Sequence, residues 1–282
     1  MPRVAATPLP QRASRFRVAS SRPSGVLGAL LLLSIATAAL LAPALTPFDP
    51  WEFAAAPLSA PSLAHLMGTD AIGRDLLSGL LFGARTSLAV AGSAAVVAAI
   101  VGTLVGLFAG YRGGWIDDLL MRVSELFQTL PRFFLIVVAL ALFGPGTDRV
   151  ALIVGLTAWP TLARVVRGET LAMRDLEFMV AARASGASHL RVIWRHVLPN
   201  VAPVVGVLSG LIFGQALLVE AAAGFVGLSD PNTVSWGGLA GQAQGYLRVA
   251  WWLCVFPGVA IATAVLGVNL LADAVGGTPR SV

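Results

Sequence analysis

Six long apolar runs constrain this chain more than any other feature of its sequence. About twenty helical residues cross a hydrocarbon core roughly 30 Å thick. The chain is 57 % hydrophobic and 12 % charged, with a mean hydropathy of +0.82, whereas ordinary soluble domains are about a quarter charged. We therefore expect an all-α integral membrane protein with about six transmembrane helices. The expected spans are Gly25–Leu45, Ser87–Phe108, Ser124–Phe143, Val150–Val166, Val201–Phe225 and Trp251–Leu271.

Proline and arginine interrupt two of these spans. Pro131 and Arg132 fall within the third run, and Pro160 and Arg164 fall within the fourth. Proline removes a backbone donor, so neighbouring helices are expected to satisfy the carbonyl groups that it frees. Such helices suit the lining of a pathway, and a plain buried kink explains them equally well.

The arginines predict the orientation of the chain, because positive charge is retained on the cytoplasmic side of short loops. Outer segments would hold only Arg74, Arg85, Arg149 and Arg248, and all the other arginines would lie on inner segments or at inner span ends, Arg132 included. Both termini are therefore expected in the cytoplasm. The pI of about 10.9 then reflects topology and attraction to anionic lipid, rather than binding of nucleic acid.

The chain divides into a tail and a membrane domain. Residues 1–24 are basic and proline-rich, which predicts a disordered cytoplasmic tail; a cleaved secretory signal is the alternative, although the apolar run that follows exceeds the 7–15 residues of a signal core. Residues 25–282 form the six-helix domain, with a periplasmic segment at 46–86. Its second half predicts a turn leading into an interfacial helix from Leu76. Asp70, Arg74 and Asp75 are interpreted as a local ion-paired turn, with a catalytic or metal cluster as the alternative.

A polar, arginine-rich island lies in the loop 174–199, between the fourth and fifth spans. EFMVAARA predicts a short helix from Glu177, Gly186 breaks it, and ASHLRVIWRHVL predicts a second amphipathic helix that Pro199 ends. A helix, a glycine corner and a helix make a compact unit, which we call the knob (residues 177–199). The arginine distribution places it in the cytoplasm, where it would meet a soluble partner.

Missing residues exclude several enzyme classes. No lysine occurs, so a G-x-x-x-x-G-K phosphate-binding loop cannot be written, and neither HExxH nor GxSxG is present. The single cysteine, Cys254, excludes an internal disulfide. His65, His189 and His196 lack helical metal-ligand spacing, apart from the seven-residue step between the last two, and His189 and His196 are better explained as polar members of the knob than as ligands. We expect no catalytic residue, no metal site and no cofactor in this chain.

Two polar residues of the fifth span are candidates for a gate or a pathway. Glu220 is either an outer-gate residue, a contact to another subunit, or a helix-end carboxylate that reaches the lipid headgroups. Gln215 is either its partner or faces a polar pathway.

Several phrases of the sequence resemble one family. AAxxxG at Ala181, Ala182 and Gly186, followed by HVLP from His196 to Pro199, closely resembles the cytoplasmic coupling loop of bacterial ATP-binding-cassette (ABC) import permeases. GTDAIGRDLLSGLLFGARTSL, residues 68–88, is similar to the segment before the second helix in the dipeptide, oligopeptide and nickel branch. The tail, the periplasmic segment and the short C-terminus resemble the second, C-type permease of such systems. Further similar phrases, in the same order, lie at residues 110–122, 159–171, 220–228, 235–239, 256–258 and 269–273.

The resemblance implies a type I importer permease in the bacterial cytoplasmic membrane, without ATP-binding activity of its own. Its partners would be a second homologous permease, two ABC ATPase domains that bind ATP and Mg²⁺, an extracytoplasmic substrate-binding protein and membrane lipid. Short peptides are the expected cargo, with nickel, glutathione-like peptides or haem as alternatives. A secondary carrier and a membrane scaffold are more distant alternatives for the function. The residues expected to couple to the ATPases are Glu177, Ala181, Ala182, Arg183, Gly186, His196, Leu198 and Pro199.

One departure from the family pattern bears on that coupling. Val180 stands where the coupling motif usually has an acidic residue. Glu177 lies one helical turn earlier, and it is expected to substitute in part for the missing carboxylate.

Overall fold

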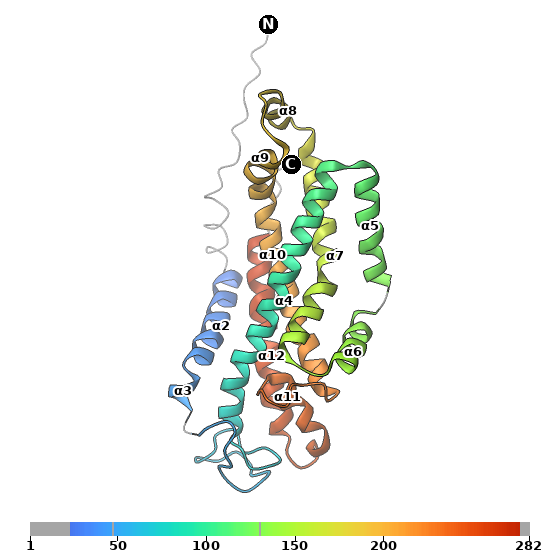
Figure 1. The fold of residues 1–282 in the computed structure, drawn as a ribbon. Helices are drawn as coiled ribbons and strands as arrows, with labels where there is room; N and C mark the ends of the chain where they lie inside the picture. Colours follow the sequence, from blue (N-terminus) through green and yellow to red (C-terminus); the bar gives the residue numbers. More distant parts are fainter. Residues whose placement is uncertain (1–22, 47, 130, 277–282) are drawn as a thin grey trace.

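The computed structural model describes residues 23–46, 48–129 and 131–276, and its regular elements are helices (Figure 1). The tail expected at residues 1–24 lies outside the described residues except for its last two. Within the described part, strand-like pairing is limited to one isolated bridge between Thr69 and Asp75. The elements are α2 Pro23–Leu40, α3 Ala42–Leu45, α4 Leu76–Arg112, α5 Gly114–Thr129, α6 Arg132–Phe143, α7 Thr147–Arg174, α8 Glu177–Ala184, α9 His189–Val192, the π-helix η1 Ile193–Val197, α10 Leu198–Phe225, α11 Trp236–Gln242, the 3₁₀-helix η2 Ala243–Tyr246 and α12 Trp252–Gly276.

Five helices are long and apolar enough to cross a membrane: α2, α4, α7, the continuous run from α9 to α10, and α12. A sixth crossing is available when α5 and α6 are taken together as one broken span. The all-helical membrane fold with about six spans is therefore confirmed. The knob lies at one end of the bundle, and α11 with the segment before α4 lies at the other (Figure 1).

The second span begins earlier than its apolar run. Helix α4 has 37 residues, about 55 Å at 1.5 Å per residue, which exceeds the hydrocarbon thickness. Its first turn is capped by Asp75, whose carboxylate accepts a hydrogen bond from the Ser78 N–H at 2.8 Å. The predicted turn leading into a helix from Leu76 is confirmed, and this helix continues into the span without a break.

Helices α4 and α7 pack with their backbones in near contact. A Cβ atom at Gly102 would lie 2.8 Å from the Trp159 carbonyl oxygen, and one at Gly106 would lie 2.5 Å from that of Ala163. Glycines four residues apart on one face thus remove the side chains that would hold the helices apart. The close approach lets the two helices behave as one rigid unit.

The third span is broken where the sequence predicts an interruption. Pro131 caps the start of α6, and the axes of α5 and α6 differ by 81°. The span also begins earlier than predicted, since α5 starts at Gly114. Asp117 in its first turn accepts two hydrogen bonds from Arg167 of α7, at 2.5 and 2.6 Å. The carboxylate of Asp117 lowers the hydropathy of this stretch of sequence, and the pairing with Arg167 accommodates its charge. Arg132 therefore lies at the break within the span, not at an inner span end as predicted.

Proline does not break the fourth span. Helix α7 runs through Pro160 for 28 residues and extends the predicted Val150–Val166 at both ends. Pro160 is buried among neighbouring side chains, which agrees with the expectation that packing supports this helix.

At the end of the bundle opposite the knob, α11 packs on the first part of α4. Trp236 of α11 is buried and donates its indole N–H to the Leu80 carbonyl of α4 at 2.9 Å.

Candidate functional site

The first half of the knob is a helix closed by a glycine corner. Helix α8 ends at Ala184, and Gly186 has φ = +80°, a conformation that a residue without Cβ adopts at little cost. The Gly186 N–H donates to Arg183 at 3.0 Å, and the Ala187 N–H donates to Ala182 at 3.2 Å. This pair of hydrogen bonds is the Schellman motif that satisfies the last carbonyls of a helix. The predicted corner at Gly186 is confirmed.

The second half of the knob continues into the membrane. Ser188 caps α9, and α9, the π-turn η1 and α10 follow without interruption as far as Phe225. The prediction that Pro199 ends the second helix was wrong. Pro199 lies in the first turn of α10, directly after the π-turn, where a missing N–H costs little. The second half of the knob is thereby continuous with the fifth span.

Apolar side chains anchor the knob to the bundle. Met179 of α8 has no exposed surface, and Val192 and Val197 are buried in the same cluster as Tyr111 of α4 and Val166 of α7. The Tyr111 hydroxyl also forms a hydrogen bond with His189 Nδ1 at 3.0 Å, with the two rings edge to face. The knob is therefore held by α4 and α7 as well as by its own chain connections.

Two polar candidates make contacts inside the knob. Arg183 donates from Nη2 to the Arg174 carbonyl at the end of α7, at 3.0 Å. The ring of His196 lies 6.2 Å from that of Phe178 and so joins η1 to α8. Glu177 and Ala181 are exposed on α8, whereas Ala182, Leu198 and Pro199 are half-buried. The structure thus gathers all eight expected coupling residues into one unit at one end of the molecule.

The outer surface of the knob carries large apolar side chains beside arginines. Val180, Leu190 and Trp194 are exposed to between 49 % and 63 %, and Arg191 and Arg195 are exposed next to them in sequence. Aromatic residues and arginine are enriched at protein–protein interfaces. This surface has the composition of a docking face. Its signal in the sequence is the helical spacing of large apolar residues, with Leu190 and Trp194 four positions apart.

Glu220 is buried between three helices. Only 6 % of its surface is exposed, and its carboxylate accepts a hydrogen bond from Ser87 Oγ of α4 at 3.0 Å. Ser87 Oγ in turn accepts from the Trp236 backbone N–H of α11 at 3.0 Å. The interpretation of Glu220 as a carboxylate that reaches the headgroups was therefore wrong. Burial on the inside of this chain lets Glu220 connect α10, α4 and α11.

Gln215 and Arg132 form a second polar contact within the bundle. Arg132 Nη1 donates to Gln215 Oε1 at 3.1 Å and joins α6 to α10. Gln215 is exposed on the surface of this chain. The reading of Gln215 as the partner of Glu220 is not supported, since within the described residues its hydrogen bond goes to Arg132, and the reading in which it faces a polar pathway stays a prediction.

The acidic residues before α4 are structural, but the predicted ion pairing was wrong. Asp70 accepts hydrogen bonds from the backbone N–H groups of Ile72 and Arg74, and Asp75 pairs with His65 Nδ1 at 2.9 Å. The Arg74 guanidinium stacks instead on Trp51, 4.9 Å from the ring centroid. In the ranges that the structure describes, no three His, Cys, Asp or Glu residues are placed to hold a metal ion.

Comparison with known proteins agrees with this architecture. Residues 102–277 match the family described as binding-protein-dependent transport system inner membrane component. A transport system permease protein of Brucella suis biovar 1 is 37 % identical over 97 % of this chain and 92 % of its own length. The di/tripeptide transport system permease protein DppC of Pseudomonas aeruginosa is 36 % identical over 94 % of this chain and 90 % of its own length.

A solved structure shares the fold. The inward-facing MetNI methionine ABC transporter superposes with a TM-score of 0.58 at 19 % identity, covering 73 % of this chain and 98 % of the matched chain. The chain belongs to the family of inner membrane permease components of binding-protein-dependent ABC transport systems.

Proposed function

We propose that this chain is a permease subunit of an ATP-driven importer of short peptides. It would form the translocation pathway with a second homologous permease and couple through the knob to two ABC ATPase domains. The observation that carries the proposal is a knob with an exposed apolar and arginine surface that is anchored by Met179 and Tyr111 to the membrane helices. The peptide cargo is supported by the name of the Pseudomonas aeruginosa relative.

The proposal assigns an orientation. The knob and both termini would lie in the cytoplasm of a bacterial cell, and the face with α11 would meet an extracytoplasmic substrate-binding protein. ATP and Mg²⁺ would be bound by the ATPases, since this chain lacks lysine and hence a phosphate-binding loop. Membrane lipid would surround the bundle, and nucleic acid is not expected among the partners.

The geometry provides a path from ATPase to membrane helices. Closure of the ATPases would move the knob, and a ligand shifts such an equilibrium only through different contacts in the two states. The knob would pass its motion directly to α10 through the π-turn and to α4 through Tyr111. Because α4 and α7 are in backbone contact at Gly106, both would move together.

Individual residues of the knob take different parts. Ala181 and Ala182 would allow close approach to a groove on the ATPase, and Glu177 would supply the carboxylate that Val180 lacks. Arg183 and His196 would hold the two halves of the knob in register, since their contacts lie inside it.

Residues farther along the chain transmit or receive the motion. Leu198 and Pro199 would form a stiff entry to α10. At the other end of α10, Glu220 would hold an outer gate formed with α11, and Gln215 would face the pathway.

The test is Gly186→Arg in the complete transporter, reconstituted with its binding protein. A non-glycine residue at φ = +80° costs about 1–2 kcal/mol and would distort the corner. We expect normal membrane insertion and continued ATP hydrolysis, with dipeptide uptake reduced at least tenfold. Ala64→Arg, which adds the same side chain to an exposed position on the opposite face, is the control. Normal uptake by the Gly186 variant would refute the proposed coupling.

A further inference from the structure

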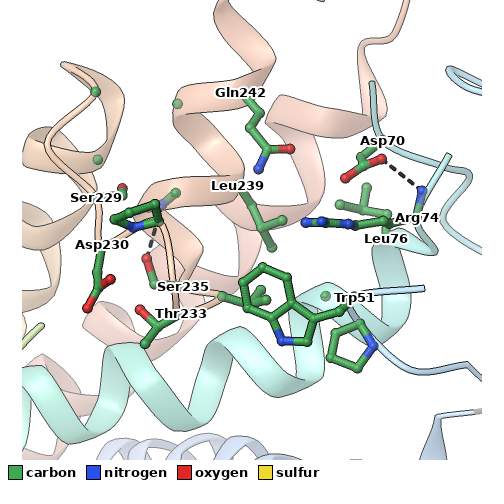
Figure 2. Close-up of a pocket in the computed structure, with 18 of the residues that line it drawn as sticks. Trp51, Asp70, Arg74, Leu76, Ser229, Asp230, Thr233, Ser235, Leu239 and Gln242 are labelled. Carbon is green, nitrogen blue, oxygen red and sulfur yellow. Dashed lines mark hydrogen bonds between the residues drawn. The ribbon is translucent and has the colours of Figure 1, made fainter. Parts of the chain in front are cut away.

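A pocket of about 340 Å³ lies between α11 and the start of α4 (Figure 2), at the end of the bundle opposite the knob (Figure 1). Its walls come from Trp51 and the start of α4, from the loop between α10 and α11, and from α11 itself. Small-molecule sites fall in the range of roughly 300–1,000 Å³, so this pocket has room for a small ligand. The segments that form it are more than 150 positions apart in the sequence, between Arg74 and Ser229.

One wall presents a cation with unused hydrogen-bond donors. Arg74 Nε is buried and has no hydrogen-bond partner among the described residues. The same part of the chain places no carboxylate oxygen within 4.0 Å of the guanidinium, whose flat face covers Trp51. The ring fixes the guanidinium and leaves its edge toward the pocket, as Figure 2 shows. A planar donor of this kind suits a carboxylate.

The other wall presents hydroxyl groups and an acid. Ser229 Oγ and Thr233 Oγ1 are buried, and neither has a hydrogen-bond partner within residues 23–46, 48–129 and 131–276. Asp230 Oδ1 accepts from the Asn232 N–H at 2.9 Å. No side chain or backbone group of the described residues donates to Oδ2, which can therefore bind a ligand donor. Asp230 and Arg74 lie on opposite sides of the pocket in Figure 2.

The charges select the class of ligand. A purely anionic ligand would satisfy Arg74 but would also meet Asp70 and Asp230, whereas a purely cationic ligand would meet Arg74. A zwitterion with its charges at opposite ends pairs with both walls. We propose that this pocket binds a short peptide through its two charged termini, with the carboxylate at Arg74 and the ammonium group at Asp230. This inference rests on the proposed peptide cargo and adds a receiving site outside the helix bundle.

The position of the pocket links its occupancy to the buried Glu220. Ser235 lines the pocket and caps α11, with its hydroxyl accepting from the Gly238 N–H at 3.1 Å. The next residue, Trp236, donates its backbone N–H to Ser87, which hydrogen-bonds Glu220. A peptide in the pocket would therefore contact the same turn that joins α11 to the ends of α4 and α10.

The test is equilibrium binding of radiolabelled dialanine to the complete transporter complex, without binding protein and without nucleotide. We expect saturable binding that Arg74→Gln weakens at least tenfold. Dialanine amide lacks the carboxylate, so it should bind weakly and equally to the parent complex and to Arg74→Gln. N-acetyl-dialanine lacks the ammonium group, so Asp230→Asn should not change its binding. Arg85→Gln is the matched control, because Arg85 lies on α4, eleven positions after Arg74, and outside the pocket. Thr233→Val provides a second test that leaves the Arg74–Trp51 stack intact.

Parallel uptake measurements with the binding protein separate the two proposals. Import of dialanine, with binding that none of the pocket variants alters, would overturn the pocket and leave the proposed function standing. Binding lost in Arg74→Gln without import by the parent complex would support the pocket and refute the cargo. If Arg74→Gln weakens association of the binding protein while dialanine binding is unchanged, Arg74 pairs with a protein carboxylate and the peptide site is refuted.

Discussion

At the scale of single residues, three side-chain contacts of this chain each join two of its helices. Glu220 reaches Ser87 on α4, Arg132 reaches Gln215 on α10, and Arg167 reaches Asp117 on α5. Burying a charged group without such a partner costs several kcal/mol. Each contact therefore ties two helices together at one depth of the membrane domain.

Replacement of Glu220 tests this role. Glu220→Ala removes the acceptor of the Ser87 hydroxyl, and we expect it to lower the free energy of unfolding by about 1.5–3 kcal/mol, the range for hydrogen bonds to charged groups. Glu220→Gln keeps a side-chain oxygen and should lose less. Thermal unfolding in detergent measures the difference, with Glu125→Ala, on the exposed side of α5, as the control. Equal melting temperatures for all three variants would show that Glu220 contributes nothing to the packing of α11.

The hydrogen bond between Tyr111 and His189 gives a second test at this scale. Tyr111→Phe keeps the edge-to-face rings and removes the hydroxyl, so the knob should lose about 0.5–1.5 kcal/mol of its attachment to α4. We expect ATP hydrolysis to continue while the uptake per ATP falls several-fold. A double-mutant cycle with His189→Leu isolates the pair. If the effects of the two substitutions on uptake per ATP are additive, the contact between Tyr111 and His189 does not transmit motion.

At the scale of elements, glycine spacing and helix ends decide which segments move together. Helices α4 and α7 touch through backbone atoms, whereas α5 and α6 are separated by the bend at Pro131. The π-turn η1 joins the knob to α10 without a loop. The knob is thus continuous with one span and packed against two others.

Two alanine substitutions on α4 test the rigid pair. In Gly106→Ala the new methyl group would lie 2.5 Å from the Ala163 carbonyl oxygen, so the helices must separate. We expect a loss of about 1–3 kcal/mol, as for overpacking in a core. At Gly92 the nearest atom to a new Cβ is 4.0 Å away, so Gly92→Ala should be neutral or stabilising through helix propensity. Scanning fluorimetry in detergent distinguishes them, and indistinguishable melting temperatures would contradict the close contact.

At the scale of the whole molecule, the two ends differ in chemistry. The knob end carries exposed apolar side chains and arginines, and the opposite end carries α11, the segment before α4 and the pocket between them (Figure 1). Arginine retention on the cytoplasmic side predicts an orientation with the knob inside.

The single cysteine makes this orientation measurable. In a Cys254→Ala background, we expect Ser185→Cys in the knob to react with a membrane-impermeant thiol reagent only after the cells are permeabilised. Ala64→Cys, exposed at the opposite end, should react in intact cells. The reverse labelling pattern would invert the topology and place the knob outside.

Local features of the sequence predicted much of the architecture. The apolar runs located the spans, because burial in lipid depends on composition within about twenty residues. Gly186 predicted the corner of the knob, because a positive φ is a property of one residue. Local patterns failed at boundaries: the start of α5 was missed because Asp117 pairs with Arg167, and Pro199 was taken as a stop although a π-turn precedes it.

By itself, the sequence determined the membrane fold, the number of spans and the position of the knob, because hydropathy, helix termination and arginine placement act over short stretches of chain. Only the tertiary structure decided which helix receives the knob, where Glu220 points and that Arg74 faces Ser229 across a pocket. These contacts join residues 78, 133 and more than 150 positions apart. Their partners are chosen by packing, which brings distant segments together only once every helix has found its neighbours.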